Sequence, residues 1–104
     1  MAASPTERSL AEMRRRGYLC AVTERWNPHA GIRQDLFGFG DVLCVGEREI
    51  VIVQSTSDSH VADRCHKIAE HPNTPAVRRG GIRIYVHGWR KVDGRWQVRE
   101  VDVS

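Results

Sequence analysis

Residues 40–57 read GDVLCVGEREIVIVQSTS, and this stretch decides the fold. Its two apolar runs are separated by Gly46-Glu47-Arg48, a combination that favours a tight turn. We therefore expect residues 36–45 and 49–54 to form the two strands of one hairpin. The run IVIV over residues 50–53 has no polar face, which is typical of a central strand covered on both sides.

The segments on either side of this hairpin add helices and further strands. The stretch SPTE at residues 4–7 combines an N-cap, a proline in the first turn and a capping box, so a helix is expected over residues 5–16. Apolar spacing predicts a second helix from about residue 60 to 71, a short helical turn over 75–79, and strands over 18–26, 82–87 and 95–103. Asp93-Gly94 favours a hairpin turn between the last two strands. The order α-β-β-β-α-β-β predicts an α/β fold in which helices flank a central mixed β-sheet.

Length and composition restrict the class of protein. The 104 residues are enough for one domain, and 40% hydrophobic with 28% charged residues is typical of a globular chain. No apolar run is long enough to cross a membrane, and the arginine-rich start does not look like a secretion signal. The three cysteines are odd in number and widely spaced, so we expect reduced thiols and a cytoplasmic location, in a bacterium or a phage-infected cell.

Metal ligation by the histidines is not expected. The chain has no CxxC pair, and His60, Cys65 and His66 do not share one helical face. A zinc site needs such a group of nitrogen and sulfur ligands, so we expect no zinc.

Asp41 and Gln54 are the residues that best suggest chemistry. They flank the tight turn on strands that should be adjacent, so their side chains can meet. Gln54 and Thr56 are two positions apart and share one face of a regular strand. A carboxylate and a second oxygen ligand suit Mg²⁺, which could activate water against a phosphodiester. Alternatively, Asp41 is an ordinary turn residue, and Ser55 and Thr56 belong to the N-cap of the following helix.

This arrangement resembles the PD-(D/E)XK nuclease superfamily, which includes restriction enzymes, Holliday-junction resolvases and phage nucleases. The resemblance covers residues 5–88 and implies a restriction-endonuclease-like αβββαβ core, here followed by one more strand, αβββαβ(β). In that family an acid lies at the second strand and an acidic-x-lysine motif on the third. Asp41 matches the first acid, and Gln54 matches the second ligand, for which glutamine is a known variant. The resemblance therefore implies Mg²⁺ held by Asp41, Gln54 and the backbone carbonyl of Ser55.

Two positions depart from the family pattern. Gly40 replaces the proline, a common change, and Thr56 stands where the family has its catalytic lysine. Some families take the missing cation from the following helix, and here Arg64 or Lys67 would supply it. Because threonine carries no charge, we expect cleavage to be slow or absent in the monomer.

Further acids are candidates for accessory roles. Glu7 and Glu12 lie on the first predicted helix, where some family members place an extra acid. Glu24 and Asp35 bracket the first loop and could approach Asp41, or they could form ordinary ion pairs with nearby arginines.

The net charge of +3 comes largely from arginine, whose planar guanidinium binds phosphate through two parallel hydrogen bonds. Positive side chains concentrate in the last third of the chain, where they would contact DNA or simply solvate a sheet edge. Trp26 and Trp89 are expected to be half-buried sheet residues rather than platforms for bases. The expected DNA-contacting residues are Arg33, Arg78, Arg79, Arg83, Arg90 and Lys91.

Three functions stay open on these grounds. The first is a Mg²⁺-dependent DNA nuclease, for which family analogy also suggests a homodimer. The second is a catalytically inactive relative that binds DNA or a protein partner. The third is a small interaction module, such as a phage-encoded inhibitor. Divalent-metal binding separates the first from the others, and salt-sensitive DNA binding separates the second from the third.

Overall fold

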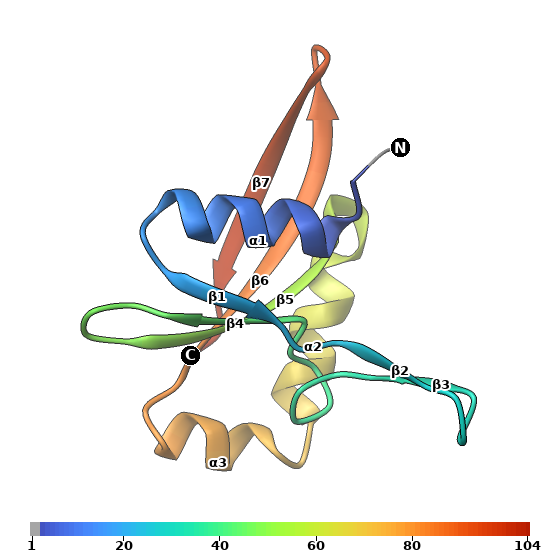
Figure 1. Ribbon diagram of the computed structural model, residues 1–104, viewed down its shortest axis with the longest axis vertical. Coiled ribbons are helices and arrows are strands. Elements are labelled where there is room, and N and C mark those ends of the chain that lie inside the picture. The colour runs from blue at the N-terminus through green and yellow to red at the C-terminus, as the bar shows by residue number, and fades with distance from the viewer. Residues whose placement is uncertain (1–2) are drawn as a thin grey trace.

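The apolar strand after the tight turn lies at the centre of a five-stranded mixed sheet. The computed structural model describes residues 3–104 (Figure 1). The strands are ordered β1 (Leu19–Val22), β4 (Val42–Val45), β5 (Ile50–Ser57), β6 (Arg83–Val92) and β7 (Arg95–Asp102). Among residues 3–104, β5 and β6 run parallel and the other neighbouring pairs of this sheet are antiparallel. Val51, Ile52 and Val53 are completely buried, which confirms the central position predicted for this run.

Helix α1 (Pro5–Arg15) covers one face of the sheet (Figure 1). It begins as predicted, because the Ser4 hydroxyl accepts a hydrogen bond of 3.1 Å from the Glu7 backbone N–H. Met13 of the helix packs into a cluster with Cys20, Val42, Cys44, Val51 and Val53. All three cysteines are free, as expected.

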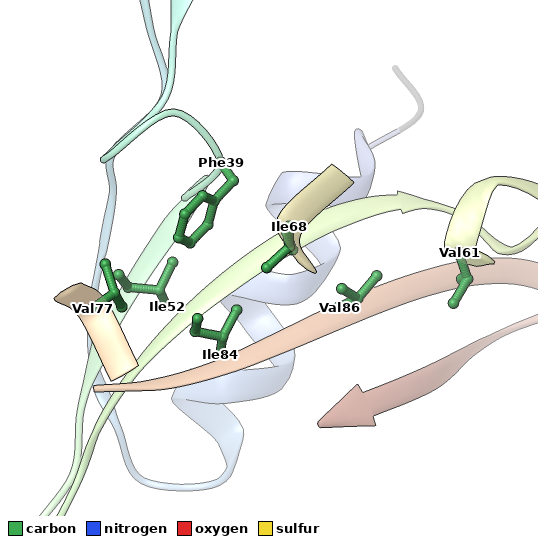
Figure 2. Packing of buried hydrophobic residues seen from close by; sticks show 7 residues of the cluster. All are labelled: Phe39, Ile52, Val61, Ile68, Val77, Ile84 and Val86. Carbon is green, nitrogen blue, oxygen red and sulfur yellow. The ribbon is translucent and has the colours of Figure 1, made fainter. Parts of the chain in front are cut away.

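The opposite face is covered by helices α2 (Val61–Glu70) and α3 (Thr74–Arg79), with the 3-10 turn η1 (Asp58–His60) leading into α2. These helices form the connection that two parallel strands require, between β5 and β6. Figure 2 shows the core beneath them, in which Ile52 of β5 and Ile84 of β6 meet the helix residues Ile68 and Val77. None of the helices among residues 3–104 is long and apolar enough to cross a membrane.

The region before the central hairpin differs from the prediction. The expected strand over residues 18–26 ends at Val22, and the expected strand over 36–45 begins only at Val42. Between them lies a two-stranded antiparallel ribbon, β2 (Arg25–Asn27) with β3 (Ile32–Gln34), that the sequence pattern did not predict. Residues 36–40 form a tight turn in which the Leu36 carbonyl accepts from the N–H groups of Phe39 and Gly40. The prediction failed because local turn hydrogen bonds outweighed the β propensity of Leu36 and Phe39.

Strands β5 and β6 are longer than predicted. Ser55 and Thr56 continue the ladder opposite His87 and Gly88, so they belong to the strand and do not cap the helix. Strand β6 continues to Val92 and returns through the predicted Asp93-Gly94 turn, in which both residues have positive φ.

A buried polar network connects α1 to the sheet. The Ser9 hydroxyl lies 2.6 Å from the Ser55 hydroxyl, 2.9 Å from His87 Nδ1 and 2.9 Å from Trp89 Nε1. His87 Nε2 lies 2.8 Å from a Glu100 oxygen. A serine, a histidine and a carboxylate that are hydrogen-bonded in this order resemble the catalytic triad of a hydrolase. Ser9, however, has no exposed surface that a substrate could reach. The network is therefore structural, since it satisfies polar groups that burial would otherwise leave unpaired.

Candidate functional site

Asp41 lies immediately before β4 and is held in the sheet by its backbone. Its N–H donates to the Val53 carbonyl, and its carbonyl accepts from the Thr23 N–H. The side chain is only 3% exposed. Its Oδ2 accepts hydrogen bonds from Gln54 Nε2 at 2.9 Å and from the Ser55 backbone N–H at 2.7 Å. The structure thus brings together Asp41 and Gln54, the pair singled out in the sequence.

Two further carboxylates join Asp41. Glu24 precedes β2 and Asp35 follows β3, so the base of the ribbon brings both acids to the start of β4. One carboxylate oxygen from each of Glu24, Asp35 and Asp41 lies within 4.8 Å of the other two. We call these three residues the acid cluster. Glu24 also forms the ion pair considered from the sequence, because its carboxylate lies 3.5 Å from Arg33 Nη1.

The acid cluster holds more negative charge than its surroundings compensate. Burial, the largest cause, together with the neighbouring Asp35 and Glu24 raises the pKa of Asp41 to about 8, although the hydrogen bond from the Ser55 N–H acts to lower it. Burial, and then the charge of Glu24, also raise the pKa of Asp35. Within residues 3–104, Asp35 Oδ1 is buried without a hydrogen-bond partner. Oxygen atoms in this state are suitable ligands for a hard divalent cation such as Mg²⁺, which would remove the repulsion.

A cavity of about 370 Å³ adjoins the acid cluster and brings positive charge toward it. Asp35 and Gln54 line one part of this cavity, and Arg64 and Lys67 of α2 line another. Arg64 Nε is buried and has no hydrogen-bond partner in the part of the chain that the structure describes. Lys67 is more exposed and lies 3.4 Å from Asp63. The two cations named from the sequence therefore share a cavity with Gln54.

The remaining residues of the predicted site lie in different surroundings. Thr56 is buried and uncharged. The Ser55 hydroxyl is turned to the α1 face, where it contacts Ser9, while its N–H contacts Asp41. Glu7 is exposed on α1, and Glu12 pairs with Arg15 and Arg16. Neither of these two helix acids belongs to the acid cluster.

The residues expected to contact DNA do not form one surface. Several already have protein partners: Arg33 pairs with Glu24, Arg78 donates to the Val103 carbonyl at 2.7 Å, and Arg83 pairs with Glu49 and Asp102. Arg79 ends α3, whereas Arg90 and Lys91 are exposed near the tip of the β6–β7 hairpin. In Figure 1 that hairpin tip and α3 lie at opposite ends of the molecule.

The tryptophans also differ from the prediction. Trp89 is 8% exposed and belongs to the Ser9 network, whereas Trp26 is 62% exposed on the ribbon. Both were expected to be half-buried. Among residues 3–104 the two-stranded ribbon has its main contacts within itself, which leaves most of Trp26 exposed.

Comparison of the chain with protein-family models, with curated proteins and with solved structures found no match.

Proposed function

We propose that this chain is a nuclease-fold protein that binds Mg²⁺ at the acid cluster and acts on phosphodiester bonds in DNA. The observation that carries the proposal is the group of oxygen ligands made by the buried Asp41 and Gln54 with the partly buried Glu24 and Asp35. Three ionised carboxylates this close repel one another, so Asp41 keeps a proton without a cation, and a bound cation would take the place of that proton. Gln54 donates from Nε2, which leaves its Oε1 as a further oxygen ligand.

The arrangement of strands supports a restriction-endonuclease-like core. β1, β4 and β5 form an antiparallel meander, α2 crosses over, and β6 returns parallel to β5. With α1 at the start, this is the αβββαβ order inferred from the sequence. The proposal is further supported by the contact between Asp41, beside the second sheet strand, and Gln54, on the third, since the resemblance implies that these two residues are metal ligands.

Each residue has a definable part in such a reaction. A Mg²⁺ ion at the acid cluster would supply an activated water and offset charge on the phosphate. Asp41, kept in place by the Ser55 N–H, would act as the principal ligand and lose its proton when the cation binds. Arg64, which faces the same cavity, would bind a phosphate oxygen and replace the missing lysine.

A second function is favoured by Thr56. This uncharged residue at the lysine position cannot polarise water as an ammonium group does, and a chain that has lost this cation would bind DNA without cleaving it. In that case Asp41→Ala should leave DNA binding largely intact.

The proposal is tested by Mn²⁺ binding, measured by calorimetry, and by cleavage of duplex, branched and single-stranded DNA with Mg²⁺ or Mn²⁺. We expect Asp41→Ala to abolish both binding and cleavage because it removes the central carboxylate. Glu47→Gln, which removes an exposed acid in the β4–β5 turn, is the matched control and should change neither. Cleavage that survives Asp41→Ala would exclude this site. Metal binding without cleavage would favour the inactive relative.

A further inference from the structure

The ribbon and the cavities beside it suggest how a nucleic acid reaches the acid cluster. A cavity of about 230 Å³ lies against Trp26 and shares Arg25 and Gln34 with a second cavity of about 660 Å³. The second cavity in turn shares Asp35 and Gly38 with the cavity of about 370 Å³ next to α2. The three hollows are therefore neighbours, in an order that runs from the ribbon, past Asp35 of the acid cluster, to Arg64. We call this series the track.

The side chains along the track suit an unpaired polynucleotide strand. Trp26 offers an open aromatic face at one end, and Phe37, also exposed, lines the middle cavity. Aromatic faces of this kind stack on bases of any sequence, provided that the bases are not already paired. Arg25 lies before the acid cluster, and Arg64 and Lys67 lie beyond it, so phosphates could be held on both sides.

The backbone conformation of the turn holds Phe37 in an exposed position. This residue has φ of 55°, a left-handed conformation that a bulky residue rarely adopts. Asn73 Nδ2 donates to its carbonyl at 2.9 Å and ties the turn to the segment between α2 and α3. The next residue, Gly38, lies so close to the His71 ring that a Cβ would be 2.3 Å from Nε2. Contacts with Asn73 and His71 therefore stabilise the strained backbone at Phe37 and Gly38. Backbone strain that the surrounding structure maintains is common at ligand-binding sites.

From these observations we infer that the track binds single-stranded DNA, with a base stacked on Trp26 and the backbone led across the acid cluster. This inference rests on the proposed function, because it names the form of DNA which that site would receive. Charge complementarity favours a polynucleotide over a second copy of the chain: Arg25 is exposed beside Trp26, and no acid among residues 3–104 lines the cavity that these two residues share.

The test is the fluorescence anisotropy of a labelled oligo-dT of about ten nucleotides, a length within the usual site size. EDTA is present so that metal chemistry cannot contribute. We expect Trp26→Ala to weaken binding at least about five-fold, the lower end of the stacking effect for one base. Trp26→Phe should retain most of the affinity because it keeps an aromatic face. Arg25→Gln should lower the slope of log K against log salt by about 0.7, the value for one phosphate contact to a single strand.

The matched control is Trp96→Ala. Trp96 is also exposed, at 46%, but it lies on the β6–β7 hairpin, where the Arg8 guanidinium covers its ring at 3.5 Å. We expect no change in affinity for this variant. An equal loss in both tryptophan variants, a preference for duplex over oligo-dT, or a Trp26→Ala change from dimer to monomer in sedimentation would overturn the inference.

The two proposals fail in different ways. If Mn²⁺ does not bind the acid cluster but Trp26-dependent binding of oligo-dT persists, the proposed function fails and the track stands. If Mn²⁺-dependent cleavage of single strands is unchanged in Trp26→Ala and Arg25→Gln, the track fails and the proposed function stands.

Discussion

The two hydrogen bonds that Asp41 accepts from Gln54 and Ser55 are concentrated on one side-chain oxygen. Both Gln54 Nε2 and the Ser55 N–H donate to Oδ2. Oδ1 receives neither of these bonds, so it has the greater capacity for a cation. The same two bonds fix the orientation of the group, which reduces the entropy lost when a metal binds.

Arg64 and Lys67 differ in how well each could replace the missing lysine. Lys67 is exposed and has Asp63 as a neighbour, whereas Arg64 has a buried Nε that lacks a partner among residues 3–104. We therefore expect Arg64→Gln to reduce the cleavage rate about ten-fold or more, because it removes a charge-assisted contact to phosphate. Lys67→Gln should reduce the rate less, because water screens the charge of an exposed side chain. Initial rates on the preferred DNA substrate would measure the difference.

Lys91→Gln serves as the control for lost positive charge, because Lys91 lies at the distant hairpin. If Lys91→Gln slowed cleavage as much as Arg64→Gln, general attraction to DNA would explain the result, and Arg64 would have no special place at the site.

At the scale of the elements, the packing of α2 on β6 depends on one glycine. A Cβ on Gly88 would lie 2.2 Å from a Val61 methyl and 3.0 Å from the Asp58 backbone. Gly88→Ala should push the start of α2 away from the sheet and lower the free energy of unfolding by about 1–3 kcal/mol, as overpacking does. Because β5 ends beside this contact, metal affinity at Gln54 should fall as well. Urea denaturation and Mn²⁺ titration measure the two effects.

Gly80→Ala is the control for Gly88→Ala. Gly80 is the C-cap residue that follows α3 and has φ of −71°, and a Cβ there would meet only ordinary contacts of 3.4 Å or more. This variant should be neutral or more stable by up to about 1 kcal/mol, since alanine restricts the unfolded chain. Equal destabilisation by both alanines would mean that Gly88 is not a special contact.

The helices and the central hairpin could be predicted because their signals are local. The Ser4 cap, the IVIV run and the Asp93-Gly94 turn each act over a few residues, and the structure contains all three. The ribbon gave a weaker signal, since each strand has only three residues and both faces are solvated. One sign was present: Asn27 Oδ1 accepts from the N–H groups of His29 and Ala30, a turn that asparagine often makes before a glycine such as Gly31.

The part of the candidate site that depends on local signals could also be predicted. Asp41 and Gln54 flank one tight turn, so their proximity follows from the hairpin. Glu24 and Asp35 reach the acid cluster through the ribbon, and that path depends on pairing the sequence pattern did not reveal. The Ser9 network joins residues from α1, β5 and β6, and no local pattern connects residues so far apart in the chain.

At the scale of the whole molecule, the sheet separates two buried ionisable centres. Asp41 lies with the acid cluster on the α2 side, and His87 lies in the Ser9 network on the α1 side. Burial disfavours the charged form of each group, so it raises the pKa of Asp41 and lowers the pKa of His87 below its ordinary value of 6.5, despite the nearby Glu100. As the pH changes, the two groups therefore change the free energy of unfolding in opposite directions.

Between pH 6.5 and 8, Asp41 should dominate the pH dependence. Its pKa is about 8 when folded and near 3.8 when unfolded, so unfolding releases a proton in this range and stability falls as pH rises. The slope for one proton is at most about 1.4 kcal/mol per pH unit. Below pH 6.5 the unfolded chain protonates His87 while the folded chain resists it, so this group makes stability fall as pH falls and offsets Asp41. We expect the free energy of unfolding in EDTA to decline from pH 6.5 to 8.

Variants at the two centres separate their contributions. Asp41→Asn should flatten the decline between pH 6.5 and 8, whereas His87→Gln should leave it in place and let stability continue to rise below pH 6.5. Mn²⁺ should reverse the trend in the wild type, because a cation needs the ionised carboxylate and therefore stabilises the fold more at pH 8 than at pH 6.5. Urea denaturation across this range, with and without metal, measures each effect. A decline that is the same in Asp41→Asn as in the wild type would show that the pKa of Asp41 is not raised in the folded protein. The ionised carboxylate would then not be disfavoured at the acid cluster, and the reason for expecting a metal there would be lost.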